Sequence, residues 1–114
     1  MSDCIFCKIA EKKLPAKIIH EDDLCLAFED ITPQAPVHTL IIPKKHISTA
    51  LEVSEVDSAL IGHLVRTAAK IAKDKGIDGK GFRLVMNTNA DAGQTVFHIH
   101  LHLLGGRAMH WPPG

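Results

Sequence analysis

The chain contains the stretch His98-Ile99-His100-Leu101-His102-Leu103-Leu104, in which three histidines alternate with apolar residues. Alternation of this kind is typical of a β-strand with one buried face, and we expect a strand over residues 95–104. Because side chains two residues apart point to the same face of a strand, the three imidazoles would share one face, opposite Phe97, Ile99, Leu101 and Leu103. That face is the candidate functional site.

Three interpretations of this histidine face are open. A solvated polar face is one, although such faces usually carry Thr, Lys or Glu. A metal site is the second, since neutral imidazole is a common zinc ligand. Catalysis is the third, with one imidazole attacking an electrophile while its neighbours hold its tautomer and relay protons. Spacing alone does not choose between metal binding and catalysis.

Hydrophobic periodicity and turn residues divide the rest of the chain into further elements. The clearest helix is expected over Ser54–Lys75, because its apolar residues recur at helical spacing. Ser54 and Asp57 resemble a capping box at its start, and Gly76 fits a left-handed cap at its end. A short helix is expected over Cys4–Lys12. Further strands are expected over residues 16–20, 24–28, 38–43 and 81–87, with loops over residues 31–36 and 88–93.

Five strands without a repeated β-α-β alternation indicate an α+β fold with an antiparallel sheet. We expect a single domain over residues 1–114, with a five-stranded antiparallel sheet, one long helix and a short N-terminal helix. One face of such a sheet would be covered by the helix or by a second copy of the chain, so a homodimer stays open.

Composition excludes several classes of protein. The 114 residues include 13 Lys and Arg against 13 Asp and Glu, so the net charge is zero and no basic surface favours nucleic acid. No apolar run is long enough for a membrane span, and the start Met1-Ser2-Asp3-Cys4 lacks the basic region of a secretion signal. Three cysteines cannot form a closed disulfide framework. We therefore expect a cytoplasmic protein without a membrane or nucleic-acid partner.

Polar residues before the triad could bind phosphate. Gly93-Gln94-Thr95 offers backbone N–H groups, an amide and a hydroxyl, which are the donors that stabilise phosphoryl oxygens. Asn87 ends the neighbouring expected strand and has the same potential. An ordinary turn with a polar strand start explains these residues equally well when they are taken alone.

The triad stretch matches the signature His-φ-His-φ-His-φ-φ, where φ is apolar, of the histidine triad (HIT) superfamily. Other blocks resemble the Hint branch of that superfamily, and together they cover nearly the whole chain from about Ile5. They are Phe28-Glu29-Asp30-Ile31, Pro33-Gln34-Ala35-Pro36-Val37-His38, Ile42-Pro43-Lys44-Lys45-His46-Ile47, Gly93-Gln94-Thr95-Val96-Phe97-His98 and Leu104-Gly105-Gly106-Arg107-Ala108-Met109-His110-Trp111-Pro112-Pro113-Gly114.

The resemblance implies a homodimer with one continuous sheet surface and a purine nucleoside phosphoramidase activity. Such an enzyme cleaves the P–N bond of adenosine or guanosine 5′-phosphoramidates through a nucleotidyl-histidine intermediate. By matching positions, His100 would be the nucleophile, flanked by His98 and His102, with His38 as a relay partner. The implied nucleotide-binding residues are Gly93, Gln94, Thr95 and Asn87 near the phosphate, Asp30 at the ribose, Ile5, Phe6, Ile9, Leu14, Phe28, Ile31 and Leu40 around the base, and Trp111 reaching toward the partner's site.

A structural metal is a separate question, because imidazole catalysis of this kind needs none. Cys4 and Cys7 form a C-x-x-C pair, and a zinc site there would need two further ligands. The resemblance implies that His46 and His98 complete a structural zinc site. A dithiol or two partly buried thiols are the alternatives. Cys25, inside an apolar segment, is expected to be a small core residue.

Two other functions remain open beside the phosphoramidase. The first is a dinucleoside polyphosphate hydrolase, another activity of the superfamily, although the block over residues 105–114 favours the Hint branch. The second is a purine nucleotide-binding or interaction module without catalysis. Turnover of the two substrate classes, compared directly, distinguishes all three.

Overall fold

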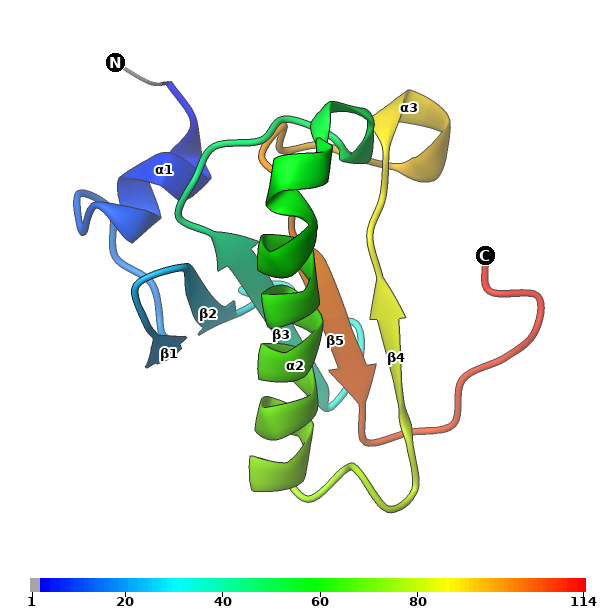
Figure 1. The fold of residues 1–114 in the computed structure, drawn as a ribbon. Helices are drawn as coiled ribbons and strands as arrows, with labels where there is room; N and C mark the ends of the chain where they lie inside the picture. The colour runs from blue at the N-terminus through cyan, green and yellow to red at the C-terminus, as the bar shows by residue number, and fades with distance from the viewer. Residues whose placement is uncertain (1–2) are drawn as a thin grey trace.

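Five antiparallel strands form one sheet in the computed structural model, which describes residues 3–114 (Figure 1). The strand order across the sheet is β1-β2-β3-β5-β4. The strands span Ile18–Glu21 (β1), Cys25–Glu29 (β2), Val37–Pro43 (β3), Phe82–Val85 (β4) and Leu101–Gly105 (β5). The helices span Ile5–Ala10 (α1), Ser58–Asp74 (α2) and Asn89–Ala92 (α3), with 3₁₀ turns at Ala50–Glu52 and Glu55–Asp57. The predicted α+β fold is confirmed.

The central strands are apolar on both faces because a helix lies against each face. Cys25 and Ala27 of β2 belong to the larger core, which packs against α2. Leu26 and Phe28, one residue out of phase, point the other way and pack against α1. Cys25 is fully buried, as predicted. Among residues 3–114, no helix is long and apolar enough to cross a membrane.

A 3₁₀ turn directly precedes the long helix α2. The Asp57 carboxylate accepts hydrogen bonds from the Ser54 backbone N–H at 3.0 Å and the Ser54 hydroxyl at 3.1 Å, so the predicted capping interaction is present. Regular α-helix begins only at Ser58, after the 3₁₀ turn, and it ends just before Gly76, whose φ is +73°. The buried residues of α2 are Leu64, Thr67, Ala68, Ile71 and Ala72.

The predicted strand over residues 95–104 is wrong in its first half. Strand β5 begins at Leu101, so His98 and His100 precede it. The Ile99 N–H bonds the Ile47 carbonyl at 2.7 Å, and the Gln94 amide bonds the Ser48 carbonyl at 2.8 Å. These contacts hold the segment against the loop after β3 instead of against β4. Phe97 is consequently 47% exposed and does not share the buried face of Ile99.

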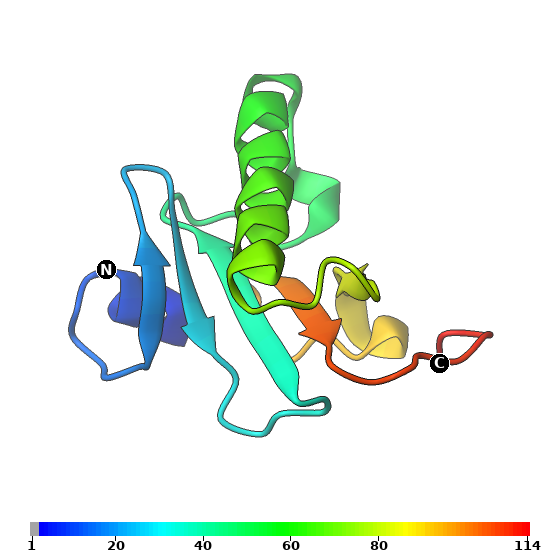
Figure 2. The same cartoon turned by 90° about the horizontal axis from the view of Figure 1, so that it is seen from below.

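The boundaries of the other elements differ less from those predicted. Strand β4 ends at Val85, two residues before Asn87, and the predicted loop over residues 88–93 contains the short helix α3. After β5 the chain leaves the sheet as a tail that extends away from the body of the molecule (Figures 1 and 2). Met1 and Ser2, in the segment where we expected no secretion signal, lie outside the described residues.

Candidate active site

The three histidines of the triad lie in two groups. The ring of His98 is fully buried at the carboxyl end of β3, where its Nε2 lies 2.8 Å from the Pro43 carbonyl oxygen. The rings of His100 and His102 lie beside each other, with centroids 4.9 Å apart. The structure therefore puts the His98 side chain beside Cys4 and Cys7 and leaves two imidazoles for the face on which α1 packs.

A backbone N–H fixes the protonation of the next pair, His38 and His102. Gln34 N–H donates to Nδ1 of His38 at 3.0 Å, so that nitrogen carries the lone pair and Nε2 carries the proton. His38 Nε2 lies 2.9 Å from His102 Nδ1, which must then be the acceptor. The proton of His102 is thereby assigned to Nε2. That atom is buried and has no hydrogen-bond partner among residues 3–114.

The backbone also fixes the tautomer of His100. Its Nδ1 lies 2.9 Å from the His98 carbonyl oxygen, which can only accept, so Nδ1 carries the proton. Nε2 of His100 is left with a lone pair, which is the form that attacks an electrophile. His100 thus offers a lone pair, and the adjacent His102 offers an N–H group.

Burial keeps these imidazoles neutral. Desolvation, the largest cause, and the neighbouring His100 and His38 together lower the pKa of His102 to about 4. Desolvation also lowers the pKa values of His100 and His38, although Asp30 opposes this in both cases. The Asp30 carboxylate lies 3.5 Å from His38 Nε2. At neutral pH the site therefore contains neutral rings beside one carboxylate.

An apolar wall stands next to the imidazoles. The Phe6 ring of α1 meets the rings of Phe28 and His100 edge-on, with centroids 5.5 Å and 5.0 Å away. Ile9 and Leu40 belong to the same buried cluster, and Leu40 is paired with His102 in the sheet register. The structure thus brings four of the predicted base-pocket residues together. The other three are more exposed: Ile5 (46%), Leu14 (39%) and Ile31 (97%).

The residues predicted to contact phosphate differ in their availability. Gln94 is buried, and its amide is already bonded to the Asn89 N–H and to the Ser48 and Val96 carbonyls. Its side chain orders the turn before the triad. Gly93, with a φ of +88°, ends α3 in the left-handed conformation. Thr95 is exposed, and Asn87 is half-buried.

Asp30 has two contacts within the protein. One carboxylate oxygen accepts the Thr32 backbone N–H at 2.7 Å, and the other faces His38. The sequence suggested Asp30 only as a ribose contact, so its position beside the His38–His102 pair was missed. Trp111, at the end of the tail, is 83% exposed.

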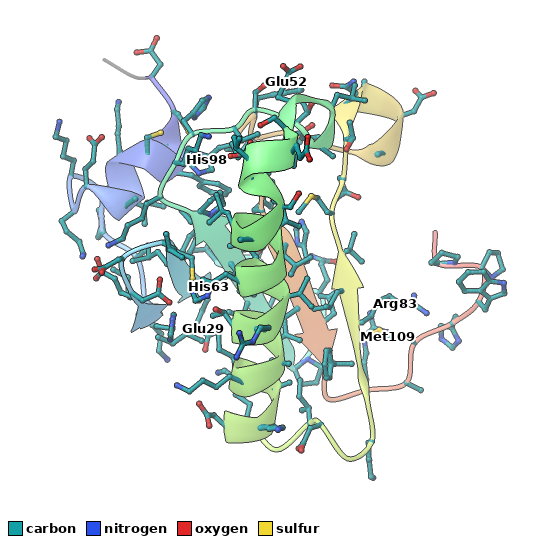
Figure 3. The ribbon with its side chains drawn as sticks, in the orientation of Figure 1. Glu29, Glu52, His63, Arg83, His98 and Met109 are labelled. Carbon is teal, nitrogen blue, oxygen red and sulfur yellow. The ribbon has the colours of Figure 1, made fainter. Side chains whose placement is uncertain are left out.

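A second group of side chains surrounds His98. The ligand atoms of Cys4, Cys7, His46 and His98 all lie within 4.8 Å of one another. Nδ1 of His98 is 3.3 Å from Cys4 Sγ, 3.5 Å from Cys7 Sγ and 3.2 Å from His46 Nδ1. Cys7 Sγ lies 3.3 Å from His46 Nδ1. Figure 3 shows His98 in this region, between α1 and the start of α2.

This arrangement fits a tetrahedral metal ion. Bonds of about 2.0 to 2.3 Å to nitrogen and sulfur place neighbouring ligand atoms about 3.3 to 3.8 Å apart, close to the spacing found here. The Pro43 carbonyl accepts the Nε2 proton of His98 and leaves Nδ1 as the lone-pair nitrogen, as in many zinc sites. An open cavity of about 730 Å³, lined in part by Cys4, Cys7 and His46, gives access from solvent.

Two contacts near His38 had no signal in the sequence pattern. Gln34, in the loop after β2, donates its N–H to His38, and its carbonyl accepts two hydrogen bonds from Arg107 of the tail. A loop and a tail separated by 73 residues meet here, and only the three-dimensional structure brings them together.

Comparison with known proteins gives consistent matches. Residues 11–109 match the family model of the HIT domain. An uncharacterized HIT-like protein of Synechocystis sp. is 56% identical over 112 residues, which are 98% of this chain and 97% of that protein. The crystal structure of a HIT family hydrolase from Legionella pneumophila superposes with a TM-score of 0.97 at 54% identity, covering 98% of this chain and all of that one.

The chain is also similar to the crystal structure of a zinc-bound histidine triad family protein from Mycobacterium smegmatis, with a TM-score of 0.79 and 32% identity. The alignment covers 98% of this chain and 80% of that one.

Proposed function

This chain belongs to the HIT domain family and has the fold of HIT family hydrolases, and we propose that it is a purine nucleoside phosphoramidase of the Hint branch. The observation that carries the proposal is the pairing of His100 and His102. Their rings are 4.9 Å apart, and the tautomers derived above give one a lone pair and the other an N–H group. A phosphoryl group needs both, a nucleophile for phosphorus and a donor for oxygen.

In the first step, Nε2 of His100 attacks the α-phosphorus of a nucleoside 5′-phosphoramidate. The P–Nε2 bond forms, the P–N bond of the substrate breaks, and the leaving nitrogen takes a proton from solvent water, so that it departs as the neutral amine. Positive charge develops on the His100 ring, and the His98 carbonyl that accepts the Nδ1–H stabilises it. The Nε2–H of His102 donates to a phosphoryl oxygen.

In the second step, water attacks the phosphorus of the nucleotidyl-histidine. The P–Nε2 bond breaks, the attacking water releases one proton to solvent, and the products are a nucleoside monophosphate and neutral His100. Because burial lowers the pKa of His100, the free ring returns to its neutral, nucleophilic form at neutral pH.

The nucleotide would lie against the apolar wall. The Phe6 ring, edge-on to His100, supports a base site formed by Phe6, Ile9, Phe28 and Leu40. Asp30 would accept hydrogen bonds from the ribose hydroxyls, and the exposed Thr95 hydroxyl would contact the phosphate or the leaving group. Gln94 would act through the turn that it holds, since its amide is already bonded to the backbone.

We further propose a structural zinc ion held by Cys4, Cys7, His46 and His98. The ligand spacing and the hydrogen bond from His98 Nε2 to the Pro43 carbonyl support it, as does the similarity to the zinc-bound protein from Mycobacterium smegmatis. The ion would supply rigidity alone. It would tie α1, which carries Phe6, to the segment that carries His100.

A homodimer is proposed on two features of the sheet and tail. β4 is an edge strand of the sheet and offers unpaired backbone groups to a second copy. The C-terminal tail extends from the body of the molecule (Figure 2), and Trp111 on that tail is exposed, so it would be available to a neighbouring subunit. Sedimentation analysis at micromolar concentration tests this part of the proposal, and a monomer would contradict it.

The activity is tested by measuring turnover of adenosine 5′-phosphoramidate and of a dinucleoside polyphosphate by the purified protein. The His100→Ala variant should lose turnover by at least about a thousandfold while still binding AMP. His63→Ala, a histidine of α2 outside this site, is the matched control and should retain turnover.

The outcomes separate the three candidate functions. Cleavage of the phosphoramidate and loss of it in His100→Ala support the proposal. Preferential cleavage of the dinucleoside polyphosphate would instead indicate the other hydrolase activity. AMP binding without cleavage of either substrate would indicate a nucleotide-binding module.

A further inference from the structure

The C-terminal tail is hydrogen-bonded to the loop after β2, and the same loop sets the protonation of His38 through Gln34. Arg107 Nη2 and Nε donate to the Gln34 carbonyl oxygen at 3.0 Å and 3.3 Å, and Nη1 donates to the Ala108 carbonyl at 3.0 Å. The same residue, Gln34, donates its N–H to Nδ1 of His38. The peptide groups on both sides of the Gln34 Cα are therefore fixed, one by Arg107 and one by His38.

A second contact between the tail and this loop lies next to Arg107, where the backbone of Gly106 packs closely against Pro36. Gly106 has a φ of +88°, and a Cβ atom there would lie 2.8 Å from Cβ of Pro36. Only glycine allows the tail to pass so near to the loop. The tail thus touches the loop at two points, Pro36 and Gln34, on the two sides of Ala35.

The protonation of His38 matters because it decides that of His102. With the proton of His38 on Nε2, His102 accepts at Nδ1 and keeps its own proton on Nε2. If the Gln34 N–H moved away, Nδ1 of His38 could take the proton, and Nε2 would become an acceptor. His102 would then donate from Nδ1, and its buried Nε2 would carry a lone pair instead of a hydrogen.

We propose that Arg107 is a positioning residue that, through the backbone of Gln34, holds His38 in the Nε2–H tautomer and so keeps His102 Nε2–H available as a donor. The assignment of the His38 and His102 tautomers follows from the hydrogen bonds of Arg107, Gln34 and His38. The effect on turnover rests on the proposed function. Arg107 itself has no hydrogen bond to the imidazoles, and its role is confined to the loop.

The experiment compares ¹⁵N-histidine NMR spectra of the protein with those of Arg107→Ala. Ring nitrogen shifts distinguish the two neutral tautomers, and a His38→Asn variant assigns the His38 signals. The unmodified protein should show His38 and His102 as Nε2–H tautomers. Arg107→Ala should show a mixture at both residues. Arg83→Ala is the matched control for the spectra, because Arg83 also binds the tail, at the His110 carbonyl, but has no bond to the loop (Figure 3).

Turnover of adenosine 5′-phosphoramidate is measured in parallel. In Arg107→Ala, kcat should fall about tenfold with little change in KM, since a donor to the reacting group is weakened and no nucleotide contact is removed. Arg66→Ala, on the exposed side of α2, controls for loss of an arginine. Gly106→Ala displaces the loop at its other contact and should reproduce both effects.

Two results would overturn the inference. One is an unchanged His38 tautomer in both Arg107→Ala and Gly106→Ala. The other is an Nδ1–H tautomer of His38 in the unmodified protein. If the tautomers respond as expected but the unmodified protein cleaves no phosphoramidate, the positioning role stands and the proposed function fails.

Discussion

The carbonyl oxygen of His98 lies 2.9 Å from Nδ1 of His100, while the ring of His98 faces the thiols of Cys4 and Cys7. One residue therefore links the cysteine-histidine cluster to the proposed nucleophile. Its ring belongs to the cluster, and its backbone sets the tautomer of the next histidine. Loss of order in the cluster should therefore displace the His98 carbonyl and weaken its hydrogen bond to His100 Nδ1.

Disruption of the cluster should therefore lower both metal content and turnover. We expect about one zinc ion per chain in protein purified without chelators, and nearly none in Cys7→Ser. Cys7→Ser should also melt several degrees lower and turn over substrate more slowly, because His98 loses a fixed position. Metal analysis, calorimetry and kinetics measure the three effects.

Cys25→Ala is the matched control for the removal of a thiol. Cys25 is buried against α2 and lies apart from the cluster, so this variant should lose stability but retain its metal. Protein that contains no metal before any chelator is added would contradict the zinc proposal, while the proposed attack by His100 would be unaffected.

The pKa of His102 predicts a pH dependence of stability. Burial lowers this pKa to about 4, whereas the unfolded chain has a histidine pKa of about 6.5. As the pH falls below about 6.5, the unfolded chain binds a proton at His102 and the folded protein does not, so the free energy of unfolding decreases. The loss continues down to about pH 4, with a slope of up to about 1.4 kcal/mol per pH unit from this residue.

The contribution of His102 is isolated with the variant His102→Gln, which cannot titrate. Urea unfolding of both proteins from pH 7.5 to pH 4.5 should give a smaller pH dependence for the variant. Parallel curves for the two proteins would show that His102 binds a proton equally in the folded and unfolded states, which would contradict the lowered pKa of the buried ring.

The sequence was most informative where the local pattern and the tertiary structure agree. Helix α2 has an apolar stripe that meets the sheet and a capping interaction within three residues, so its position could be predicted to within a few residues. The strands β2 and β3 are short apolar runs between turns, and their boundaries shift by only one residue. These signals are local, and packing reinforces them.

At the triad, the alternation of polar and apolar residues gave a wrong prediction for where the strand begins. Residues 95–104 alternate as a strand would, but Ile99 pairs with Ile47 and Gln94 binds Ser48, which pulls the first half off the sheet. Alternation cannot reveal such long-range contacts. The Arg107–Gln34 contact was invisible for the same reason, since nothing in the sequence links the tail to that loop.

Helix α2 should be sensitive to loss of volume at its buried face. Leu64 is fully buried against the sheet, so Leu64→Ala should destabilise the protein by about 3 kcal/mol through lost burial and the cavity left behind. Val65→Ala, at the next position and 43% exposed, should cost well under about 1 kcal/mol. Chemical denaturation measures both, and equal losses would contradict the packing of α2 described here.

Asp22 should be a further point of stability, because one carboxylate joins three elements. One oxygen accepts the backbone N–H groups of Leu24 and Cys25 at 2.8 Å and 2.9 Å. The other lies 2.8 Å from His20 Nε2 of β1 and 2.7 Å from His63 Nε2 of α2. Burial would raise the pKa of Asp22, but these hydrogen bonds outweigh it and hold the pKa far below its ordinary value.

Asp22→Asn keeps the size of the side chain but replaces an acceptor with a donor and removes the charge, so it should cost about 2 kcal/mol at pH 7. Asp23→Asn, at the exposed neighbouring position, should change stability by less than about 0.5 kcal/mol. Because the folded-state pKa of Asp22 is depressed, its contribution is complete above about pH 4 and is lost as the pH falls further. The difference in unfolding free energy between the protein and Asp22→Asn should therefore shrink steadily as the pH falls below about 4, and a difference that stays constant from pH 7 to pH 2.5 would show that the carboxylate charge is not what stabilises the turn.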